Sequence, residues 1–173
     1  MVAGGRYAFS AIAGGQSLPA GTSAFAHGNG VSYSDPDGAY TAQFPTRATF
    51  ETKDIDVDGG TLTANLASVS VDNSYEMGIA SMPIAVPADK VDDSLKAGTD
   101  GFVTDANGTV LSQKRGTLGV AQTLDTRLKV DDGYTAHILV VISSGEMYVL
   151  FVHAKHGTDP LFSALDKSFV PRA

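Results

Sequence analysis

Residues 134–154 read YTAHILVVISSGEMYVLFVHA, and they decide the fold class because they predict two adjacent apolar strands joined by a short loop. If the loop is Ser143–Glu146, Leu139 lies opposite Leu150. One face of the hairpin then carries Leu139, Val141, Tyr148 and Leu150, and the other carries Ile138, Val140, Val149 and Phe151. Because both faces are apolar, we expect central strands with other elements packed on each side.

Outward from this hairpin, turn residues and alternating apolar positions predict a sheet of sequential strands. The predicted strands are Ala39–Phe44, Thr49–Val57, Thr61–Asp72, Tyr75–Ala85, Thr109–Lys114, Ala121–Val130, Tyr134–Ile142 and Met147–Ala154. Most of the connections are short and rich in Gly, Asp and Ser, which favours hairpins between neighbouring strands. The strands therefore predict an antiparallel meander.

In two segments the apolar residues recur at the spacing of an α-helix rather than at that of a strand. One follows Pro87 and has Val91, Leu95 and Phe102 on one stripe, with Asn107-Gly108 as a turn or left-handed cap after it. The other begins at Asp159-Pro160, and its stripe is Leu161, Leu165 and Phe169.

The two helices cannot both lie on one face of the sheet if both apolar faces are to be buried. The sequence therefore favours an α+β fold, an antiparallel β-sheet with helices on both faces, in a three-layer α/β/α sandwich. A two-layer α+β sandwich, with the N-terminal segment over the second face, is the alternative.

The chain has 173 residues, which is the size of one domain. Residues 1–30 predict a Gly-rich leader or peripheral segment, and residues 31–173 predict a single α/β/α sandwich domain. Residues 7–13 are too short an apolar run for the core of a signal peptide.

Composition limits the function classes. The net charge is -7, and the chain has only 12 Lys and Arg residues. This composition argues against nucleic-acid binding, because neutralising phosphates needs clustered cations. The chain has no cysteine, so it has neither disulfides nor a cysteine nucleophile. Its acidic residues are mostly Asp, which we interpret as typical of an exported or cell-envelope protein. A cytoplasmic protein is the alternative, and membrane contact is expected only through a tether outside the given residues.

The order of elements resembles the PsbP-like superfamily, which includes photosystem accessory subunits, a Ran-binding nuclear import factor and many exported bacterial proteins. The similar segments are Tyr33–Pro45, which ends in Phe-Pro, the helix after Pro87, the turn Gly116–Gly119, the strand Met147–Leu150 and the closing helix Phe162–Phe169. The resemblance implies an α/β/α fold and a role in binding or assembly without catalysis.

Two groups of residues are weak candidates for metal binding. Asp54, Asp56 and Asp58 copy the start of a calcium loop, but position twelve is Asn65, so the outer face of a strand is the preferred reading. His153, His156 and Asp159 are ligand types that suit zinc, although they need not converge. His137 lies inside a predicted buried strand, where a hydrogen-bonded core histidine is expected.

Two basic pairs lie on adjacent predicted strands: Lys114-Arg115, and Arg127 with Lys129. They predict one small positive patch that could accept a partner's carboxylates or a phosphate, and a solvated edge is the alternative.

No residue pattern predicts a catalytic site or a cofactor, so we expect a non-enzymatic binding or accessory module with a protein partner. Its oligomeric state stays open. The alternative is a carrier of a small apolar ligand, in a pocket between sheet and helix that Tyr148, Met147 and Phe151 could line. A metal-dependent hydrolase is the third possibility.

Overall fold

The computed structural model describes residues 25–57, 60–71, 74–130, 133–155 and 157–172. Its strands are β1 (Val31–Ser34), β2 (Tyr40–Phe44), β3 (Thr49–Val57), β4 (Gly60–Val71), β5 (Tyr75–Pro83), β6 (Thr109–Leu118), β7 (Ala121–Lys129), β8 (Thr135–Ser143), β9 (Glu146–Ala154) and β10 (Val170–Pro171). Its helices are the 3-10 turn η1 (Ala88–Lys90), α2 (Val91–Asp105) and α3 (Asp159–Ser168).

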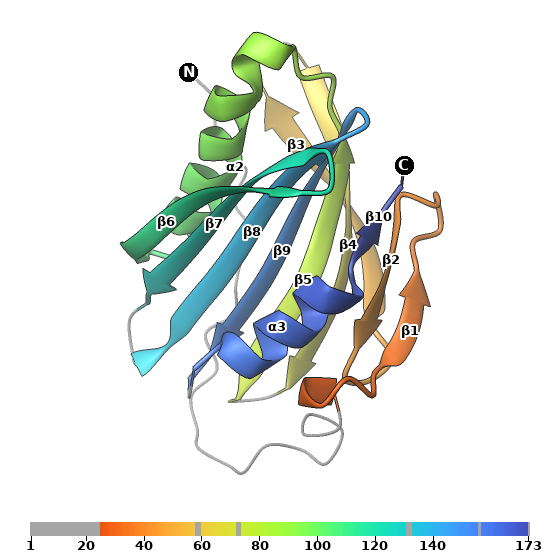
Figure 1. Cartoon of the computed structure of the whole chain (residues 1–173), viewed down its shortest axis with the longest axis vertical. Helices are drawn as coiled ribbons and strands as arrows, with labels where there is room; N and C mark the ends of the chain where they lie inside the picture. Colours follow the sequence, from red (N-terminus) through yellow and green to blue (C-terminus); the bar gives the residue numbers. More distant parts are fainter. Residues whose placement is uncertain (1–24, 58–59, 72–73, 131–132, 156, 173) are drawn as a thin grey trace.

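Seven strands form the main sheet in the order β3-β4-β5-β9-β8-β7-β6, and every pairing is antiparallel (Figure 1). A small sheet has the order β1-β2-β10. Sequential hairpins build each half of the main sheet, and the pairing of β5 with β9 joins the halves. The fold is therefore α+β with a mostly antiparallel sheet, as the sequence predicts.

The β8–β9 hairpin has the predicted register, with Leu139 opposite Leu150 and Ile142 opposite Met147. The loop is two residues shorter than expected, because Ser143 pairs with Glu146. Ser144 and Gly145 form the turn with φ of 49° and 78°, the left-handed pair that suits a two-residue hairpin.

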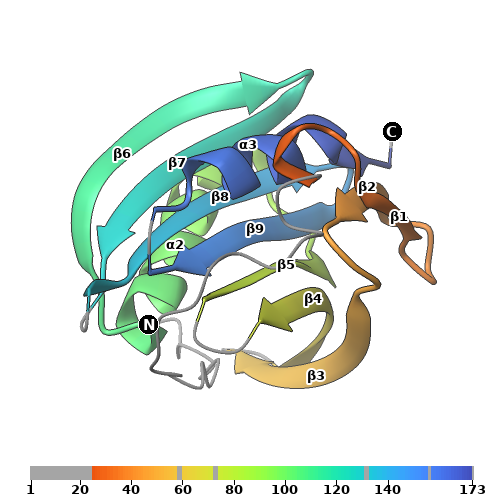
Figure 2. The ribbon, with the colours of Figure 1, turned by 90° about the horizontal axis from the view of Figure 1, so that it is seen from below.

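The two faces of this hairpin enter different cores, as predicted. Leu139, Val141, Tyr148 and Leu150 belong to one buried cluster, and Ile138, Val140, Val149 and Phe151 belong to the other. Helix α2 packs over the second cluster through Leu95 and Phe102. Helix α3 and the small sheet pack over the first cluster, on the opposite face (Figure 2).

The face that the two-layer alternative assigned to the N-terminal segment is covered by α3, β1, β2 and β10. Phe25 belongs to that same core and is 1% exposed, so packing begins inside the stretch 1–30 that the sequence assigned to a leader. Residues 1–24 lie outside the described residues.

The structure adds two strands to those predicted and lengthens a third. β1 was not predicted, because only a turn was recognised at Ser34–Gly38. This turn joins β1 to β2. The Asp35 carboxylate accepts hydrogen bonds from the backbone N–H groups of Asp37 and Ala39. β6 runs to Leu118 rather than to Lys114, and β10 was not predicted. Helix α2 ends as expected, with Asn107 at φ 48°.

Candidate functional site

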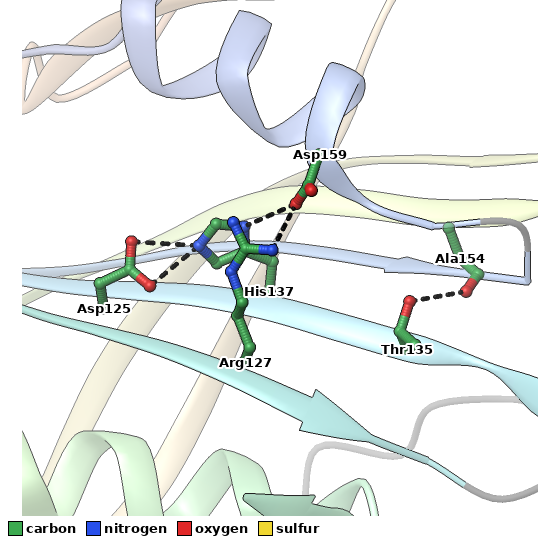
Figure 3. A network of polar contacts seen from close by, with 6 residues as sticks. All are labelled: Asp125, Arg127, Thr135, His137, Ala154 and Asp159. Atoms are coloured by element: carbon green, nitrogen blue, oxygen red, sulfur yellow. Dashed lines mark hydrogen bonds and ion pairs between the residues drawn. The ribbon is translucent and has the colours of Figure 1, made fainter. Parts of the chain in front are cut away.

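A polar network fills the contact between α3 and strands β7 and β8 (Figure 3). His137 Nε2 lies 3.0 Å from Asp125 Oδ1 and 3.1 Å from Asp125 Oδ2. Arg127 Nη1 lies 2.8 Å from Oδ1 of Asp159, the first residue of α3. The same oxygen is 4.0 Å from His137 Nδ1, which is too far for a hydrogen bond.

The imidazole of His137 is 5% exposed and stacks on Phe162, with ring centroids 3.5 Å apart and planes 17° apart. The predicted core histidine with a hydrogen bond is therefore confirmed. Its Nδ1 is buried and has no hydrogen-bond partner among the described residues. The polar edge of the ring binds Asp125 of β7, and its apolar face packs on Phe162 of α3.

Asp166 lies on the same helix, and its carboxyl has a raised pKa. Burial is the largest cause, the nearby Asp125 carboxylate raises the pKa further, and His137 and Lys167 lower it. The network thus contains three carboxylates, one guanidinium and one imidazole, in Asp125, Asp159, Asp166, Arg127 and His137. Among the hydrogen bonds of the described residues, no hydroxyl reaches the imidazole, so the network does not have the nucleophile and base arrangement of acyl transfer.

Of the predicted calcium-type residues, the structure describes the side-chain contacts of Asp54. Asp54 lies on β3, and its Oδ1 accepts a hydrogen bond of 2.9 Å from Thr63 Oγ1. The backbone of Asp56 pairs with Thr61 on the next strand. Asp58 lies outside the described residues.

Two of the predicted zinc-type residues, His153 and Asp159, lie on opposite faces of the sheet. His153 pairs with Ala136 of the α2-side core, whereas Asp159 contacts His137 on the α3 side. The His153 ring stacks on Tyr134 at 4.8 Å, and burial lowers its pKa. His156 lies outside the described residues. In the described part of the chain, no three His, Cys, Asp or Glu side chains could hold a metal ion together.

The four basic residues do not form one patch. Successive strand residues face opposite sides, so Lys114 and Arg115 point to different faces of the sheet. Arg115 forms an ion pair with Asp92 of α2, and Arg127 is paired with Asp159 of α3. Lys114 and Lys129 have no carboxylate within ion-pair distance in the described ranges. Alternation removes Arg115 from the predicted patch. Lys114, Arg127 and Lys129 lie on the face that carries Asp125, and Arg127 is neutralised there by Asp159.

Tyr148 is not available as a ligand contact. It is fully buried, and its hydroxyl donates a hydrogen bond of 2.8 Å to the backbone oxygen of Ala39. Met147 and Phe151 are buried in the α2-side core. The space between sheet and helix is filled at all three positions.

A cleft of about 650 Å³ lies at one end of the main sheet instead. We name it the end cleft, and it is lined by Ile84, Ala85, Val86, Pro87, Ala88, Val91, Val120, Ala121, Gln122, Ile142, Ser143, Ser144 and Gly145. No charged residue is among them. Val120 occupies the tip of the β6–β7 hairpin and is 94% exposed.

Sequence reasoning missed the end cleft, although two signals pointed to it. A valine stands in a tight turn at Gly119-Val120, where polar residues are usual. An apolar run, Ile84–Val86, follows β5 where a surface connection is expected to be polar.

A second cleft of about 460 Å³ lies beside α3. It is more polar, and Gln43, Ser163, Lys167 and Ser168 line part of it. The Ser168 hydroxyl already accepts a hydrogen bond from the backbone N–H of Gln43 and donates one to the Leu165 carbonyl. We therefore regard this cleft as a packing feature of α3.

Among the described residues, no helix has both the length and the apolar character that crossing a membrane requires. No protein-family model and no curated protein sequence matches the chain. The solution structure of cyanobacterial PsbP from Synechocystis sp. PCC 6803 is similar, with a TM-score of 0.50 and 15% sequence identity over 82% of this chain and 92% of that chain. The order of elements and this similarity together show that the chain has a PsbP-like fold.

Proposed function

We propose that the protein is a non-enzymatic binding module that acts through protein-protein contacts, and that the end cleft receives an uncharged apolar segment of the partner. The observation that carries the proposal is the exposure of Val120 beside an apolar hollow whose described lining residues carry no charge. Burying apolar surface is favourable by about 25 cal/mol per Å², and an uncharged cleft favours uncharged side chains.

A non-catalytic role is supported by what the polar side chains already do. His137 and Asp125 bind each other, Arg127 binds Asp159, and the Tyr148 hydroxyl binds a backbone carbonyl. Each of these groups stabilises the packing of one element on another.

Photo-crosslinking tests the proposal. We would place p-benzoylphenylalanine at position 120 and, as the control, at exposed position 163 on α3, in the organism that makes the protein. We expect one protein adduct from position 120 and none from 163. Adding Val86→Asp should remove the adduct, because it places a carboxylate in the end cleft. The proposal is wrong if no adduct forms at 120, or if Val86→Asp leaves it unchanged.

A small apolar ligand is the second candidate occupant of the end cleft. The cleft volume lies in the range of about 300–1,000 Å³ that small-molecule sites have. The test is a titration with N-phenyl-1-naphthylamine, a neutral apolar dye, together with a native mass spectrum of the purified protein. Dye fluorescence that Val86→Trp abolishes, or a retained small-molecule mass, would favour the carrier.

We further propose that the molecule is organised as a three-layer α/β/α sandwich. The position of α2 over one core and of α3 over the other supports this, although α3 shares its layer with β1, β2 and β10.

We also propose that the protein works outside the cytoplasm, as an exported or cell-envelope protein. Its composition, in which Asp is the main acidic residue, supports this location. Digestion of intact cells, and of cells with a permeabilised outer layer, by an added protease tests it. A chain that resists the protease until the cytoplasm is opened would contradict an extracytoplasmic location.

A further inference from the structure

The main sheet ends in two unlike edge strands, β6 on one side and β3 on the other. Within the described ranges, each pairs with one neighbour only, so one row of backbone N–H and C=O groups on each edge faces outward. Such a row is a template for a strand from another molecule.

Both edges are open to solvent. Every residue of β6 except Leu118 is exposed. Helix α2 packs mainly against β7 and β8, and α3 packs against β2 and β9 (Figure 2). Helix α2 reaches the β6 edge through the ion pair of Asp92 with Arg115. After an irregularity between Val110 and Ser112, the β6 register is regular to Leu118, and β3 is regular along its whole length.

The charges on the two edges are opposite. β6 contains Lys114 and Arg115 and no acidic residue, which gives the strand a charge of +2, although Arg115 also forms an ion pair with Asp92 of α2. β3 contains Glu51, Asp54 and Asp56 against Lys53, which gives it a charge of -2. Lys114 lies opposite Asp125 of β7 in the register without forming an ion pair in the described part of the chain, and Asp54 forms no ion pair there either.

Charge therefore distinguishes the possible pairings. Two β6 edges paired antiparallel along their full length would place Lys114 and Arg115 of both copies within a few residues of each other, and like charges across strands are destabilising. Two β3 edges would repel in the same way. A β6 edge beside a β3 edge brings opposite charges together.

Exposed apolar side chains accompany the charges on both edges. Val110 and Leu111 on β6 are 43% and 61% exposed, and Phe50 on β3 is 43% exposed. Pairing the edges would remove part of this surface from water.

We propose that the β6 edge of one molecule adds to the β3 edge of a second copy, so that the sheets continue head to tail. This contact is heterologous, because it uses two different surfaces, and it leaves one free edge at each end of the assembly. The edge contact does not use the end cleft, so its test is independent of the test of the proposed partner site.

Sedimentation of the purified wild-type protein is the first test. We expect the average mass to rise with protein concentration at about 10 mM salt, where the Debye length is about 30 Å, and to fall to that of the monomer at about 1 M salt, where it is about 3 Å. A monomer at all concentrations in low salt would overturn the proposal.

A charge exchange is the decisive test. Lys114→Glu with Arg115→Glu makes both edges acidic, and Glu51→Lys with Asp54→Lys makes both edges basic, so neither double variant should self-associate. Mixed in equal amounts, they present opposite charges again and should assemble. Failure of the mixture to assemble, or self-association of either variant alone, contradicts edge pairing.

The matched control is Lys90→Glu in η1 with Lys96→Glu on α2, which changes the net charge by the same amount as the β6 variant. It should associate like the wild type, whereas a loss of association would assign the effect to net charge rather than to the edge. Circular dichroism and thermal melts establish that all variants are folded. Val86→Asp in the end cleft should leave self-association unchanged.

Discussion

His137 shows how a single side chain can look functional and act in packing. A histidine beside two aspartates suggests a general base, but its ring is covered by Phe162 and its Nε2 is occupied by Asp125. The sequence was sufficient to predict this outcome, because the neighbours of His137 in the strand are apolar. It could not predict Asp159 as a neighbour, since that contact depends on where α3 docks.

The carboxyl of Asp166 should make stability depend on pH. Its pKa is raised in the folded state, so the folded protein holds this proton at a pH where the unfolded chain has lost it, and stability falls as the pH rises through that window. Asp166→Asn removes the ionisation. We expect the variant to gain stability over the wild type at about pH 7 and to gain none at about pH 3.

Urea unfolding at the two pH values measures this difference. Asp93→Asn, which changes an exposed carboxylate on α2, is the control and should not reproduce the pH-dependent gain. An equal effect of Asp166→Asn at both pH values would contradict the raised pKa.

Two glycines should respond in opposite ways to the same substitution. A Cβ on Gly78 would lie 2.7 Å from the Ala67 carbonyl oxygen and 2.8 Å from Cζ of Phe151, whereas a Cβ on Gly101 meets nothing within 4 Å. We expect Gly78→Ala to lower the free energy of unfolding by about 1–3 kcal/mol. Gly101→Ala, inside α2, should raise it by about 0.5–1 kcal/mol. Urea denaturation measures both, and two changes of the same sign would contradict the packing at Gly78.

At the scale of the element, local patterns predicted most strands and both helices because each long element carries its own periodic signal. The β8–β9 hairpin was predicted together with its register and both of its faces. β10 was missed because two residues carry no period, and its pairing with β2 depends on where α3 ends. Strand alternation was sufficient to predict that Lys114 and Arg115 lie on opposite faces of the sheet. The ion pair of Arg115 with Asp92 was not predictable, because it depends on where α2 packs.

Helix α3 should depend on Phe162 for its attachment. Phe162 is buried and stacks on His137, so Phe162→Ala removes an aromatic contact and leaves a cavity beside an imidazole. We expect a loss of about 3–5 kcal/mol in the free energy of unfolding. Hydrogen exchange of α3 should also become faster than that of α2, which lies on the other face.

Ser163→Ala is the control for that measurement, because the neighbouring side chain is exposed on the same helix. It should change the free energy of unfolding by no more than about 0.5 kcal/mol. If Phe162→Ala accelerated hydrogen exchange equally in α2 and α3, the prediction that Phe162 specifically attaches α3 would be contradicted.

At the scale of the whole molecule, stability should decrease from the centre of the sheet to its edges. β9 has two strand neighbours and is almost entirely buried, whereas β6 has one neighbour and is exposed along its length. We expect amide protection to be greatest in β8 and β9 and least in β6, measured by native-state hydrogen exchange of the monomer in high salt. Protection of β6 equal to that of β9 would contradict this gradient.

The end cleft belongs to this scale as well, so the sequence could signal only single parts of its lining, Val120 and Ile84–Val86, and not the cleft itself. Its lining comes from the β5–η1 connection, the β6–β7 turn and the β8–β9 turn, which are far apart in the chain. Periodicity assigns residues to faces of single elements and contains no information on which turns gather at one end. The same limit applies to the opposite charges of β3 and β6, because strand order decides which strands become edges.

The pairing of β5 with β9 has a kinetic consequence. Each half of the main sheet forms from neighbouring hairpins, but the two halves can join only when the chain from residue 84 to residue 145 closes into a loop. Closing a long loop costs entropy before any contact across it forms, and proteins with many such contacts fold slowly. We therefore expect two quickly formed meanders and a slow joining step, so that substitutions along the β5–β9 seam change the rate of folding more than those within either half.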